Sequence, residues 1–335
     1  MNALAPDRLI RIGLGFRESK TLLSAVELGV FTALAEGPLD LTALSQRVGV
    51  HRRGARDFFD ALVALELLTR DAQGRYANAP DCARYLDRAS PDYIGGELEL
   101  ANARQFAPWG KLTDALRTGE PQSGARGTAN YAAYYADRQV LENVARGMTG
   151  GTRLAAERLA ECFPWSDYNT LIDIGTAQGC LPVQIALAHR HISGGGFDLP
   201  PLRDLFETYV AQHGVGDRLR FLAGDFFADP LPRADVLVMG RVLHNWDLAG
   251  KLALLRKAYE ALPAGGALIV YERLIDDERR TNMAGFMASL NMLVVTAGGF
   301  DFSGADCKAW MTEVGFRHVE TTPLTAVQSM IVGRK

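Results

Sequence analysis

The chain has few cysteines, and no two of them stand close together. Cys82, Cys162, Cys180 and Cys307 are the only four among 335 residues, so none has the spacing of a zinc or redox motif. We therefore expect reduced thiols, as in a cytoplasmic protein, and no metal site.

Long apolar runs and a surplus of one charge are also missing. No run approaches the roughly 20 apolar residues that span a bilayer, and the first residues lack the charged start and apolar core of an export signal. A net charge of −3 gives no general attraction to nucleic acid or to an anionic membrane. These absences leave a cytoplasmic enzyme or regulator, whose length of 335 residues favours two domains.

The first hundred residues predict a helical domain. Residues 9–36 predict one long helix with apolar side chains on more than one face, which a partner subunit would cover. Two shorter helices over 41–48 and 53–65 and a hairpin over 67–77 follow, in the order of a winged helix. We expect residues 1–102 to form this domain and to have a dimerising role.

A winged helix also raises the alternative of a DNA-binding regulator. His51, Arg52 and Arg53 at the start of the second short helix favour contact with a phosphate backbone. Asp57 and Asp60 on the same helix, and the lack of an overall basic surplus, oppose that alternative. We expect no nucleic-acid partner.

Strands alternate with helices from residue 170 onward, within a second domain expected over residues 103–335. Strands are expected at 170–174, 193–197, 219–223, 235–239, 267–272, 316–321 and 328–333, and helices at 180–189, 201–213, 248–261, 281–295 and 303–314. This repeated alternation predicts an α/β fold with a parallel, doubly wound, Rossmann-like sheet.

A glycine-marked loop follows the first of these strands. Asp173 lies near the strand end, and Gly175 and Gly179 bracket a turn before a helix, which is where open α/β sheets hold nucleotide-like ligands. Thr, Ala and Gln at positions 176–178 do not fit the G-x-G-x-x-G dinucleotide fingerprint. Asp198 ends the second strand, where an acid suits the two hydroxyls of a ribose.

The later strand ends carry further candidate groups. Asp225 and Phe226 follow the third strand and suit an adenine, with a turn-capping carboxylate and a core ring as the other interpretation. His244 stands just past the fourth strand, and histidine is the side chain best suited to take a proton near neutral pH. Glu272 ends the fifth strand and could face His244, and Asp301 is a second candidate for that task.

Over nearly its whole length, the chain resembles the small-molecule S-adenosylmethionine-dependent O-methyltransferases. The type is that of the caffeic acid and acetylserotonin enzymes, in the version found in bacterial secondary metabolism and antibiotic biosynthesis. Residues 244–246 (His-Asn-Trp), 224–227 (Gly-Asp-Phe-Phe) and 263–266 (Pro-Ala-Gly-Gly) with Glu272 carry the resemblance. It implies a class I methyltransferase fold, S-adenosylmethionine as cofactor, and a homodimer formed through the N-terminal domain.

The resemblance also implies roles for single residues. His244 matches the general base, and Glu272 and Asp301 match the two acids that flank it. Gly175 is expected at the methionine end of the cofactor, with Asp198 at the ribose. The full set expected to bind the cofactor is Asp173, Gly175, Gly179, Asp198, Leu199, Asp225, Phe226 and Arg241.

Three departures from the family pattern stand out. Thr176 and Ala177 replace two glycines of the loop. Gly240 stands where plant relatives carry a lysine, and we expect the neighbouring Arg241 to take over polar contacts. Asp301 stands where a glutamate is common, so its side chain is shorter by one methylene.

The acceptor pocket is predicted from the helix at 281–295, which follows the Glu272 strand and should overhang the crevice. Met148, Met287, Asn291 and Met292 are the expected lining, since methionines suit flat aromatic substrates, although core packing also explains a methionine. We expect methylation of a hydroxyl, phenolic for example, on a small aromatic or polyketide-type product. C- or N-methylation on the same fold is the alternative.

Overall fold

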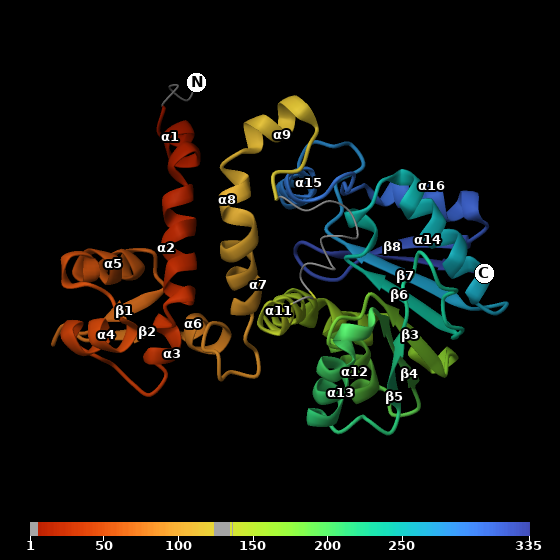
Figure 1. Ribbon diagram of the computed structural model, residues 1–335, viewed down its shortest axis with the longest axis horizontal. Coiled ribbons are helices and arrows are strands. Elements are labelled where there is room, and N and C mark those ends of the chain that lie inside the picture. Colours follow the sequence, from red (N-terminus) through yellow and green to blue (C-terminus); the bar gives the residue numbers. More distant parts are fainter. Residues whose placement is uncertain (1–5, 124–134, 136) are drawn as a thin grey trace. The chain divides into compact units, whose positions relative to one another are not determined.

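The computed structural model describes residues 6–123, 135 and 137–335, and the chain divides into two compact units, residues 1–103 and 104–335 (Figure 1). A short π-helical turn, η1 (Ala101–Gln105), runs across the boundary in sequence. Among the described residues, no helix combines the length and the apolar character needed to cross a membrane.

The N-terminal unit is helical with one small hairpin. Its elements are α1 (Asp7–Leu14), α2 (Phe16–Glu27), α3 (Val30–Ala33), α4 (Leu41–Val48), α5 (Arg52–Ala64), β1 (Leu68–Arg70), β2 (Tyr76–Asn78), α6 (Pro80–Tyr85) and α7 (Gly95–Leu100). Phe31, Leu44, Phe59, Leu62 and Tyr76 are fully buried together in its core. The order α4, α5, β1, β2 is that of the expected winged helix.

Local chemistry explains where α4 begins and ends. Asp40 accepts a hydrogen bond from the backbone N–H of Ala43 at 2.8 Å, which caps the first turn of the helix. Gly49 ends the helix with φ 70°, a left-handed conformation that glycine adopts at little cost.

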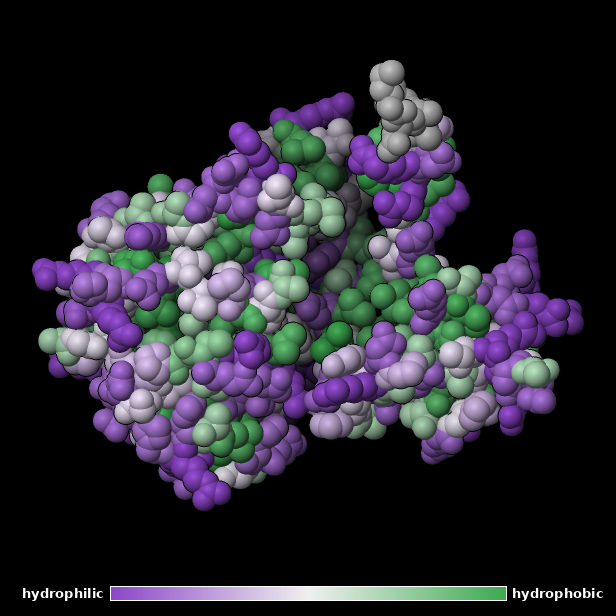
Figure 2. All heavy atoms as spheres, turned by 180° about the vertical axis from the view of Figure 1, so that it is seen from behind, coloured by the Kyte–Doolittle hydropathy of each residue, from purple (hydrophilic) through white to green (hydrophobic). Residues whose placement is uncertain are grey.

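The prediction of one helix over residues 9–36 is wrong, because the segment forms three helices. α1 and α2 are separated at Gly15, and Gly29 ends the second stretch with φ 72°. α1 also buries no residue within this chain. Its apolar side chains are exposed: Leu9 63%, Ile10 55%, Ile12 60% and Leu14 39%, with Phe16 of α2 at 57%. Figure 2 shows hydrophobic residues at the surface of this unit, among polar ones.

The second unit contains a seven-stranded sheet and its helices. The helices are α8 (Phe106–Trp109), α9 (Leu112–Thr118), α11 (Arg138–Cys162), η2 (Trp165–Asp167), α12 (Cys180–Ala188), η3 (Pro200–Leu202), α13 (Arg203–Gln212), η4 (Leu243–Asn245), α14 (Leu248–Ala261), α15 (Met283–Val295) and α16 (Gly304–Val314). The strands are β3 (Thr170–Ile174), β4 (Ser193–Asp198), β5 (Leu219–Ala223), β6 (Val236–Gly240), β7 (Ala267–Glu272), β8 (Arg317–Pro323) and β9 (Ser329–Arg334).

The sheet order is β5-β4-β3-β6-β7-β9-β8, and the α/β class is confirmed. The expectation of a wholly parallel sheet is wrong at its end, because β9 pairs antiparallel with both β7 and β8. Only residues 324–328 join β8 to β9, which is too short for the crossover that a parallel pair needs. The sheet is therefore mixed.

Both faces of the sheet are covered by helices (Figure 1). On one face, α14 and α16 bury residues such as Leu254 and Met311 against strand residues such as Leu237. On the other face, α11 and α12 bury residues such as Leu159 and Ile185 against the strands. Because helices cover both faces of the sheet, only the ends of its strands are left for a binding site.

The strand order places a crevice between β3 and β6. From β3 the chain proceeds outward to β4 and β5, whereas β6 and β7 lie on the other side of β3. Such a reversal opens the crevice in which doubly wound folds bind their ligands, at the carboxyl ends of the strands. Asp173, Asp198, Gly240 and Glu272 all lie at or near carboxyl ends on this edge.

Candidate functional site

The loop between β3 and α12 makes a tight turn at the crevice. Gly175, Ala177 and Gly179 have φ values of 76°, 51° and 91°, so three of five residues are left-handed. Gly175 also packs on Val242, to which an added Cβ would come within 2.9 Å. The glycines at 175 and 179 are thus required by the turn itself, whereas Ala177 adopts the same conformation with a methyl group.

A second glycine compensates for the threonine in this loop. Thr176 is buried, and a Cβ added at Gly196 of β4 would come within 2.2 Å of its Cγ2 atom. The side chain that replaces a family glycine at 176 therefore occupies space that the glycine at 196 leaves open.

Asp173 and Asp198 are buried carboxylates on neighbouring strands. Burial raises the pKa of Asp173 to about 7 and that of Asp198 to about 6, the latter against the opposing effect of two backbone donors. Those donors are the N–H groups of Ala177, at 2.9 Å, and Leu199, at 2.7 Å.

The two buried carboxylates fit a nucleoside that carries a positive charge. Each carboxylate oxygen has two lone pairs, so Asp198 can accept hydrogen bonds from ribose hydroxyls while it keeps its backbone donors. A cationic ligand group would also favour the charged forms of Asp173 and Asp198, whose pKa values burial raises. The residues of this crevice therefore fit the predicted cofactor.

Asp225 and Phe226 lie in the loop after β5. Asp225 Oδ1 accepts a hydrogen bond from the N–H of Phe227 at 2.8 Å, so the carboxylate caps its own turn. The Phe226 ring is half-buried and packs edge-on against Trp246, with centroids 5.8 Å apart. The loop thus packs against the segment that carries His244. The contacts are compatible with both interpretations of Asp225 and Phe226, binding of an adenine or a capped turn with a core ring.

Gly240 is a glycine for a packing reason. A Cβ at this position would come within 2.0 Å of the Tyr271 ring, so Tyr271 occupies the space where a longer side chain would begin. Arg241, the next residue, has φ 55° and donates its backbone N–H to the Tyr271 carbonyl at 3.0 Å. Tyr271, from the neighbouring strand, therefore fills the space beside Gly240.

His244 and two carboxylates form a buried cluster. His244 lies in η4, and its Nδ1 atom is 3.0 Å from Glu272 Oε2 and 3.6 Å from Asp301 Oδ1. Glu272 also accepts the backbone N–H of His244 at 3.3 Å. Both carboxylates are thus at ion-pair distance from Nδ1, and Glu272 is the nearer of the two. Because Nδ1 faces both acids, Nε2 lies on the opposite edge of the ring.

The two acids control the protonation of the imidazole. Burial by itself lowers the pKa of His244, but the attraction of Glu272 and Asp301 outweighs it and raises the pKa to about 9. His244 is therefore cationic at neutral pH in this structure, and its neutral, proton-accepting form predominates only above that pH.

The same cluster is the place to consider a metal. The ligand atoms of His244, Glu272 and Asp301 lie within 4.8 Å of one another, close enough for a divalent cation between them. Direct ion pairing of Nδ1 with Glu272 at 3.0 Å and with Asp301 at 3.6 Å accounts for the arrangement of the three side chains. We interpret the cluster as an acid–base group.

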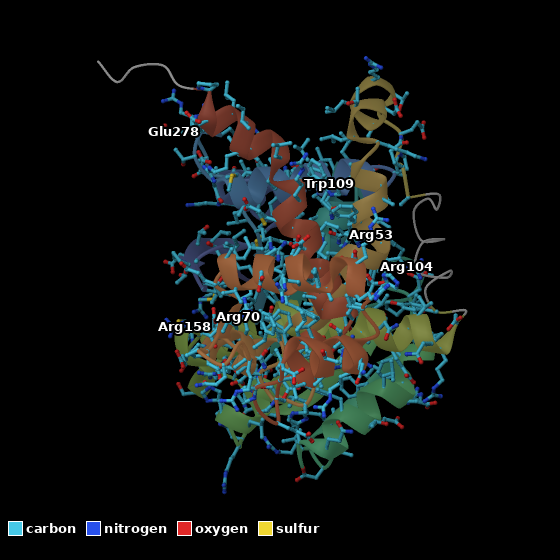
Figure 3. The ribbon with its side chains drawn as sticks, turned by 90° about the vertical axis from the view of Figure 1, so that its left-hand side faces the viewer. Arg53, Arg70, Arg104, Trp109, Arg158 and Glu278 are labelled. Carbon is cyan, nitrogen blue, oxygen red and sulfur yellow. The ribbon has the colours of Figure 1, made fainter. Side chains whose placement is uncertain are left out.

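The predicted acceptor residues differ in their environments. α15 packs against η4, so this helix does lie over the His244 segment. Met287 is 44% exposed, whereas Met292 is buried at 7%. Asn291 shares a face with Met287 and accepts a hydrogen bond from the indole N–H of Trp109 at 2.9 Å. Met148 is half-buried in α11. Trp109, on α8, is labelled in Figure 3.

Sequence reasoning missed three contributors. No local pattern marks Tyr271, and Trp109 is one of many aromatic residues in its segment; their contacts connect them to Gly240 and Asn291. Lys251, in α14, is fully buried. A lysine in an amphipathic helix normally reads as surface; the available signal was its position on the apolar face with Leu254 and Leu255, which are three and four residues further on.

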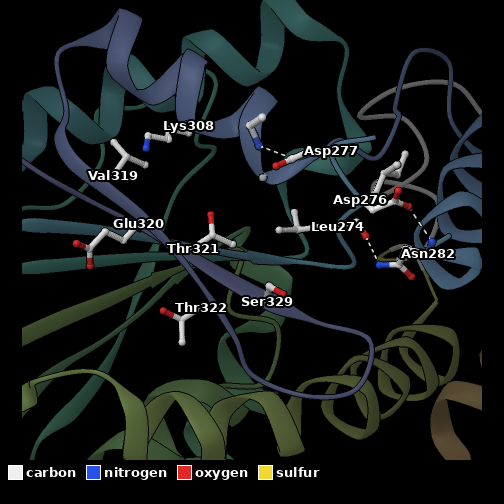
Figure 4. A pocket seen from close by; sticks show the side chains of 13 residues that line it. Leu274, Asp276, Asp277, Asn282, Lys308, Val319, Glu320, Thr321, Thr322 and Ser329 are labelled. Carbon is white, nitrogen blue, oxygen red and sulfur yellow. Dashed lines mark hydrogen bonds between the residues drawn. The ribbon is translucent and has the colours of Figure 1, made fainter. Parts of the chain in front are cut away.

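A separate cavity of about 810 Å³ lies beside β8 and the start of α16 (Figure 4). Asp276 and Asp277 at its rim accept hydrogen bonds from the backbone N–H groups of Asn282 and Ala305 at 2.7 and 2.9 Å. None of the predicted site residues lines it, and its carboxylates are engaged in shaping the loop.

The basic residues of the winged helix are partly engaged. Arg70 forms an ion pair with Asp60 at 3.3 Å, and the same carboxylate accepts the Tyr76 hydroxyl at 2.7 Å. Arg53 lies exposed near the start of α5 (Figure 3).

Comparison with known proteins gives matches along nearly the whole chain. The family model described as an O-methyltransferase domain matches residues 109–317, and that of an O-methyltransferase dimerisation domain matches residues 10–88. The chain is 40% identical over 330 residues to the tetracenomycin polyketide synthesis 8-O-methyl transferase TcmO of Streptomyces glaucescens, covering 98% of this chain and 97% of that protein.

Two further similarities bear on function. The N,N-dimethyltransferase OxyT of Streptomyces rimosus is 38% identical over 311 residues, which covers 92% of this chain and 90% of that protein. Human N-acetylserotonin methyltransferase, solved in complex with S-adenosylmethionine, has a TM-score of 0.91 at 28% identity, covering 100% of this chain and 99% of that one.

Proposed function

Since this chain belongs to the family of S-adenosylmethionine-dependent O-methyltransferases, we propose that it methylates a hydroxyl of an aromatic or polyketide-type natural product, with His244 as general base. The observation that carries the proposal is the His244–Glu272–Asp301 cluster beside the crevice, with Nδ1 turned to the acids. A cytoplasmic location and a role in secondary metabolism belong to the same proposal.

The cofactor pocket is assigned to the crevice between β3 and β6. When bound, S-adenosylmethionine supplies a methyl group on a positively charged sulfur, which makes the leaving group a neutral thioether. Asp198 would accept ribose hydroxyls, and the buried carboxylate of Asp173 would favour a positive group in the crevice. Gly175 brings the backbone close, while Leu199 and Phe226 supply apolar surface. Alignment of the reactants by such residues can contribute about 7–11 kcal/mol to catalysis.

His244 handles the proton. In its neutral form, His244 keeps its hydrogen on Nδ1, the nitrogen that faces Glu272, and the Nε2 lone pair is free. As the acceptor oxygen forms its bond to the methyl carbon, its proton moves to Nε2, and the two acids stabilise the resulting imidazolium. A positioned base of this kind contributes about 10²–10⁴-fold in rate. The products are the methyl ether and the neutral thioether of the spent cofactor.

N-methylation is the second candidate. It is favoured by the 38% identity to a protein named an N,N-dimethyltransferase. An amine acceptor already has a free lone pair, so His244 would be dispensable for such a substrate. The behaviour of a His244 variant therefore separates the two chemistries.

The N-terminal unit is assigned to dimer formation. Its match to a dimerisation domain and the exposed apolar side chains of α1 support a second copy of this chain as its partner. Apolar side chains that stay exposed in the monomer are covered most simply by the same surface of another copy.

The proposal is tested by incubating the protein with isotopically labelled S-adenosylmethionine and matched panels of phenols and aromatic amines, and locating the methyl group by mass spectrometry. We expect label on oxygen, a loss of about 10²-fold or more in His244→Gln, and no loss in the control His318→Gln, whose side chain is exposed. EDTA is expected to leave the rate unchanged. Full turnover by His244→Gln, or label on nitrogen alone, would contradict the proposal.

A further inference from the structure

Lys251 is a buried amine close to the catalytic cluster. Among the residues that the structure describes, the buried charged side chains are the carboxylates of Asp173, Asp198, Glu272 and Asp301 and the amine of Lys251, which is 0% exposed. Taking an ammonium out of water is costly unless it gains compensating partners. Its contacts therefore indicate what it does.

The Lys251 ammonium joins two segments of the site. Nζ donates a hydrogen bond to the carbonyl of Trp246, two residues after His244. On its other side, Nζ lies 3.4 Å from the centroid of the Phe300 ring and 5.6 Å from that of Phe302, which are cation–π distances. Phe300 and Phe302 are the residues on either side of Asp301.

The two segments touch directly as well. A Cβ added at Gly299 would come within 2.5 Å of the His244 carbonyl oxygen, so the backbone before Phe300 lies against the catalytic turn. Beyond Phe302, the backbone is fixed to the end of β7, because the N–H of Ile275 donates to the Phe302 carbonyl at 2.9 Å. Lys251 is thus the side chain that bonds to the histidine segment and to the Asp301 segment at once.

Charge balance gives the same residue a second effect. Glu272 and Asp301 place two negative charges beside His244, and both act electrostatically on Lys251, as do Asp247 and Cys307. Burial lowers the pKa of Lys251 to about 8 despite these acids, so the amine is still mostly protonated at pH 7. Its positive charge offsets one of the two carboxylates and so limits how strongly they hold the proton on His244.

We propose that Lys251 is a positioning residue for the transfer: its ammonium fixes the main chain after His244 against the aromatic pair around Asp301, and its charge makes the neutral, proton-accepting form of His244 more accessible. This inference rests on the proposed role of His244 as the base.

The first test needs neither methyl donor nor acceptor. The imidazole of His244 is titrated by NMR in protein labelled at histidine, with His244→Gln identifying its signal among the six histidines. We expect Lys251→Met to move the His244 midpoint upward by about one pH unit, because the variant removes a nearby like charge that disfavours the imidazolium. Lys251→Arg keeps the charge and should leave the midpoint near its wild-type value.

The matched control is Arg256→Met on the same helix. Arg256 is exposed and pairs with Glu313 at 3.6 Å on the surface, so its loss should not move the His244 titration. Circular dichroism and thermal melting of each variant show whether the fold is kept. If Lys251→Met does not fold, Lys251→Gln, which retains a hydrogen-bond donor for the Trp246 carbonyl without the charge, is used for the same titration.

The second test uses turnover. Lys251→Met should lower kcat by about tenfold or more at pH 7, and the midpoint of its pH–rate profile should move to higher pH, as in the titration. The affinity for S-adenosylhomocysteine should stay within about twofold of wild type, because Lys251 is not assigned to that pocket. Lys251→Arg should recover most of kcat.

The outcomes separate this inference from the proposed function. A folded Lys251→Met or Lys251→Gln protein whose His244 midpoint is unmoved or lowered overturns the role of Lys251, whatever the activity. A midpoint that moves as expected in a protein without methyl transfer upholds the coupling of Lys251 to His244 and overturns the proposed reaction instead.

Discussion

At the scale of single residues, the protonation of His244 decides when the site can act. Two carboxylates stabilise the imidazolium, so the proton that makes His244 inactive as a base is held to about pH 9. The same raised pKa stabilises the fold: the contribution is complete below the ordinary value of 6.5 and is lost as the pH rises through about 9. Activity and this part of the stability therefore change in opposite directions with pH.

The pH dependence of kcat/KM is the first prediction. The rate should rise with pH to a midpoint near 9, because only the neutral imidazole accepts a proton. Glu272→Gln removes the negative charge that does most to raise the pKa of His244 and should move the midpoint down by about 1–2 units. It should also lower the plateau rate, since the ring loses the carboxylate that orients it. Stopped-time assays from pH 6 to 10 give both values.

A control tests whether ionisation of the acceptor, and not of His244, causes the rise of the rate with pH. A phenol ionises at a pKa of about 10, but that ionisation does not depend on the enzyme variant. Glu278→Gln, at an exposed carboxylate far along the loop from the cluster, should retain the wild-type midpoint. If the midpoint of the pH–rate profile is unchanged in Glu272→Gln, the ionisation of His244 does not cause the rise in rate.

Ala177, in the loop between β3 and α12, has a strained backbone conformation. Its φ of 51° is a conformation that disfavours any side chain. Ala177→Gly should therefore raise the free energy of unfolding by about 0.5–1 kcal/mol, the strain relieved less the entropy that glycine adds to the unfolded chain. Urea titration measures it, with Ala253→Gly in the middle of α14 as the opposite case, expected to destabilise by about 1 kcal/mol. A loss of stability in Ala177→Gly would mean that the loop is not strained there.

The residues of the site were predictable where they lie at or just after the end of a strand. Asp198 and Glu272 end buried strands and His244 comes shortly after one, and parallel strands bring such ends to one edge. Lys251 and Tyr271 were not predictable in the same way, because each acts through a neighbour from another element. Their contacts depend on which strands and helices are adjacent, and no local pattern carries that information.

At the scale of elements, the site depends on two loops that meet without side chains between them. Gly298 and Gly299 precede Phe300 and bring the loop after α15 against the turn that holds His244. An added Cβ at Gly299 would meet the His244 carbonyl at 2.5 Å, whereas one at Gly298 would meet only the exposed Asp247, at 3.2 Å. The two glycines are thus a matched pair for a packing experiment.

Gly299→Ala should lower kcat by about 10–100-fold, because moving His244 by even a fraction of an ångström misaligns the base. Gly298→Ala should stay within about twofold of wild type. Steady-state kinetics with a shared thermal-melting check compares the two. Equal activity in both variants would show that the approach of these loops does not set the position of His244.

The errors of prediction at this scale have physical causes. The prediction of one helix over 9–36 rests on apolar spacing alone. The segment is interrupted at Gly15, whose own angles remain right-handed (φ −59°, ψ −21°), and it ends at Gly29, whose left-handed conformation cannot continue a helix. The alternation of strands and helices implied a parallel sheet up to β7, and it failed where no helix separates β8 from β9. Helix 248–261 was predicted to the residue, since Asp247 caps it through the N–H of Gly250 at 2.8 Å.

At the scale of the whole molecule, the exposed apolar surface of the first helices is the feature to explain. Leu9, Ile12 and Phe16 are 63%, 60% and 57% exposed in one chain. A surface of that kind is unfavourable in water and favours association. Ile12 and Phe16 lie in the segment 10–88 that matches a dimerisation domain, and Leu9 directly precedes it.

The triple variant Leu9→Ser, Ile12→Ser, Phe16→Ser should shift the protein from dimer to monomer, because it removes apolar area that would be buried between copies. Light scattering coupled to size-exclusion chromatography gives the mass. The control is Leu116→Ser with Leu154→Ser, two residues of the second unit that are each 60% exposed. An unchanged mass in the triple variant, or a monomer in the wild type, would contradict a dimer formed through this surface.

The order of strands in the sheet has a consequence for synthesis on the ribosome. β9 comes last along the chain, yet it lies between β7 and β8 in the sheet. Until residues 329–334 have left the exit tunnel, β7 has an open edge and β8 has no neighbour to pair with. Translation can finish the N-terminal unit early, but the domain that carries Glu272 is completed only when its final strand is inserted, and a nascent chain stalled before that point presents an unpaired edge to chaperones.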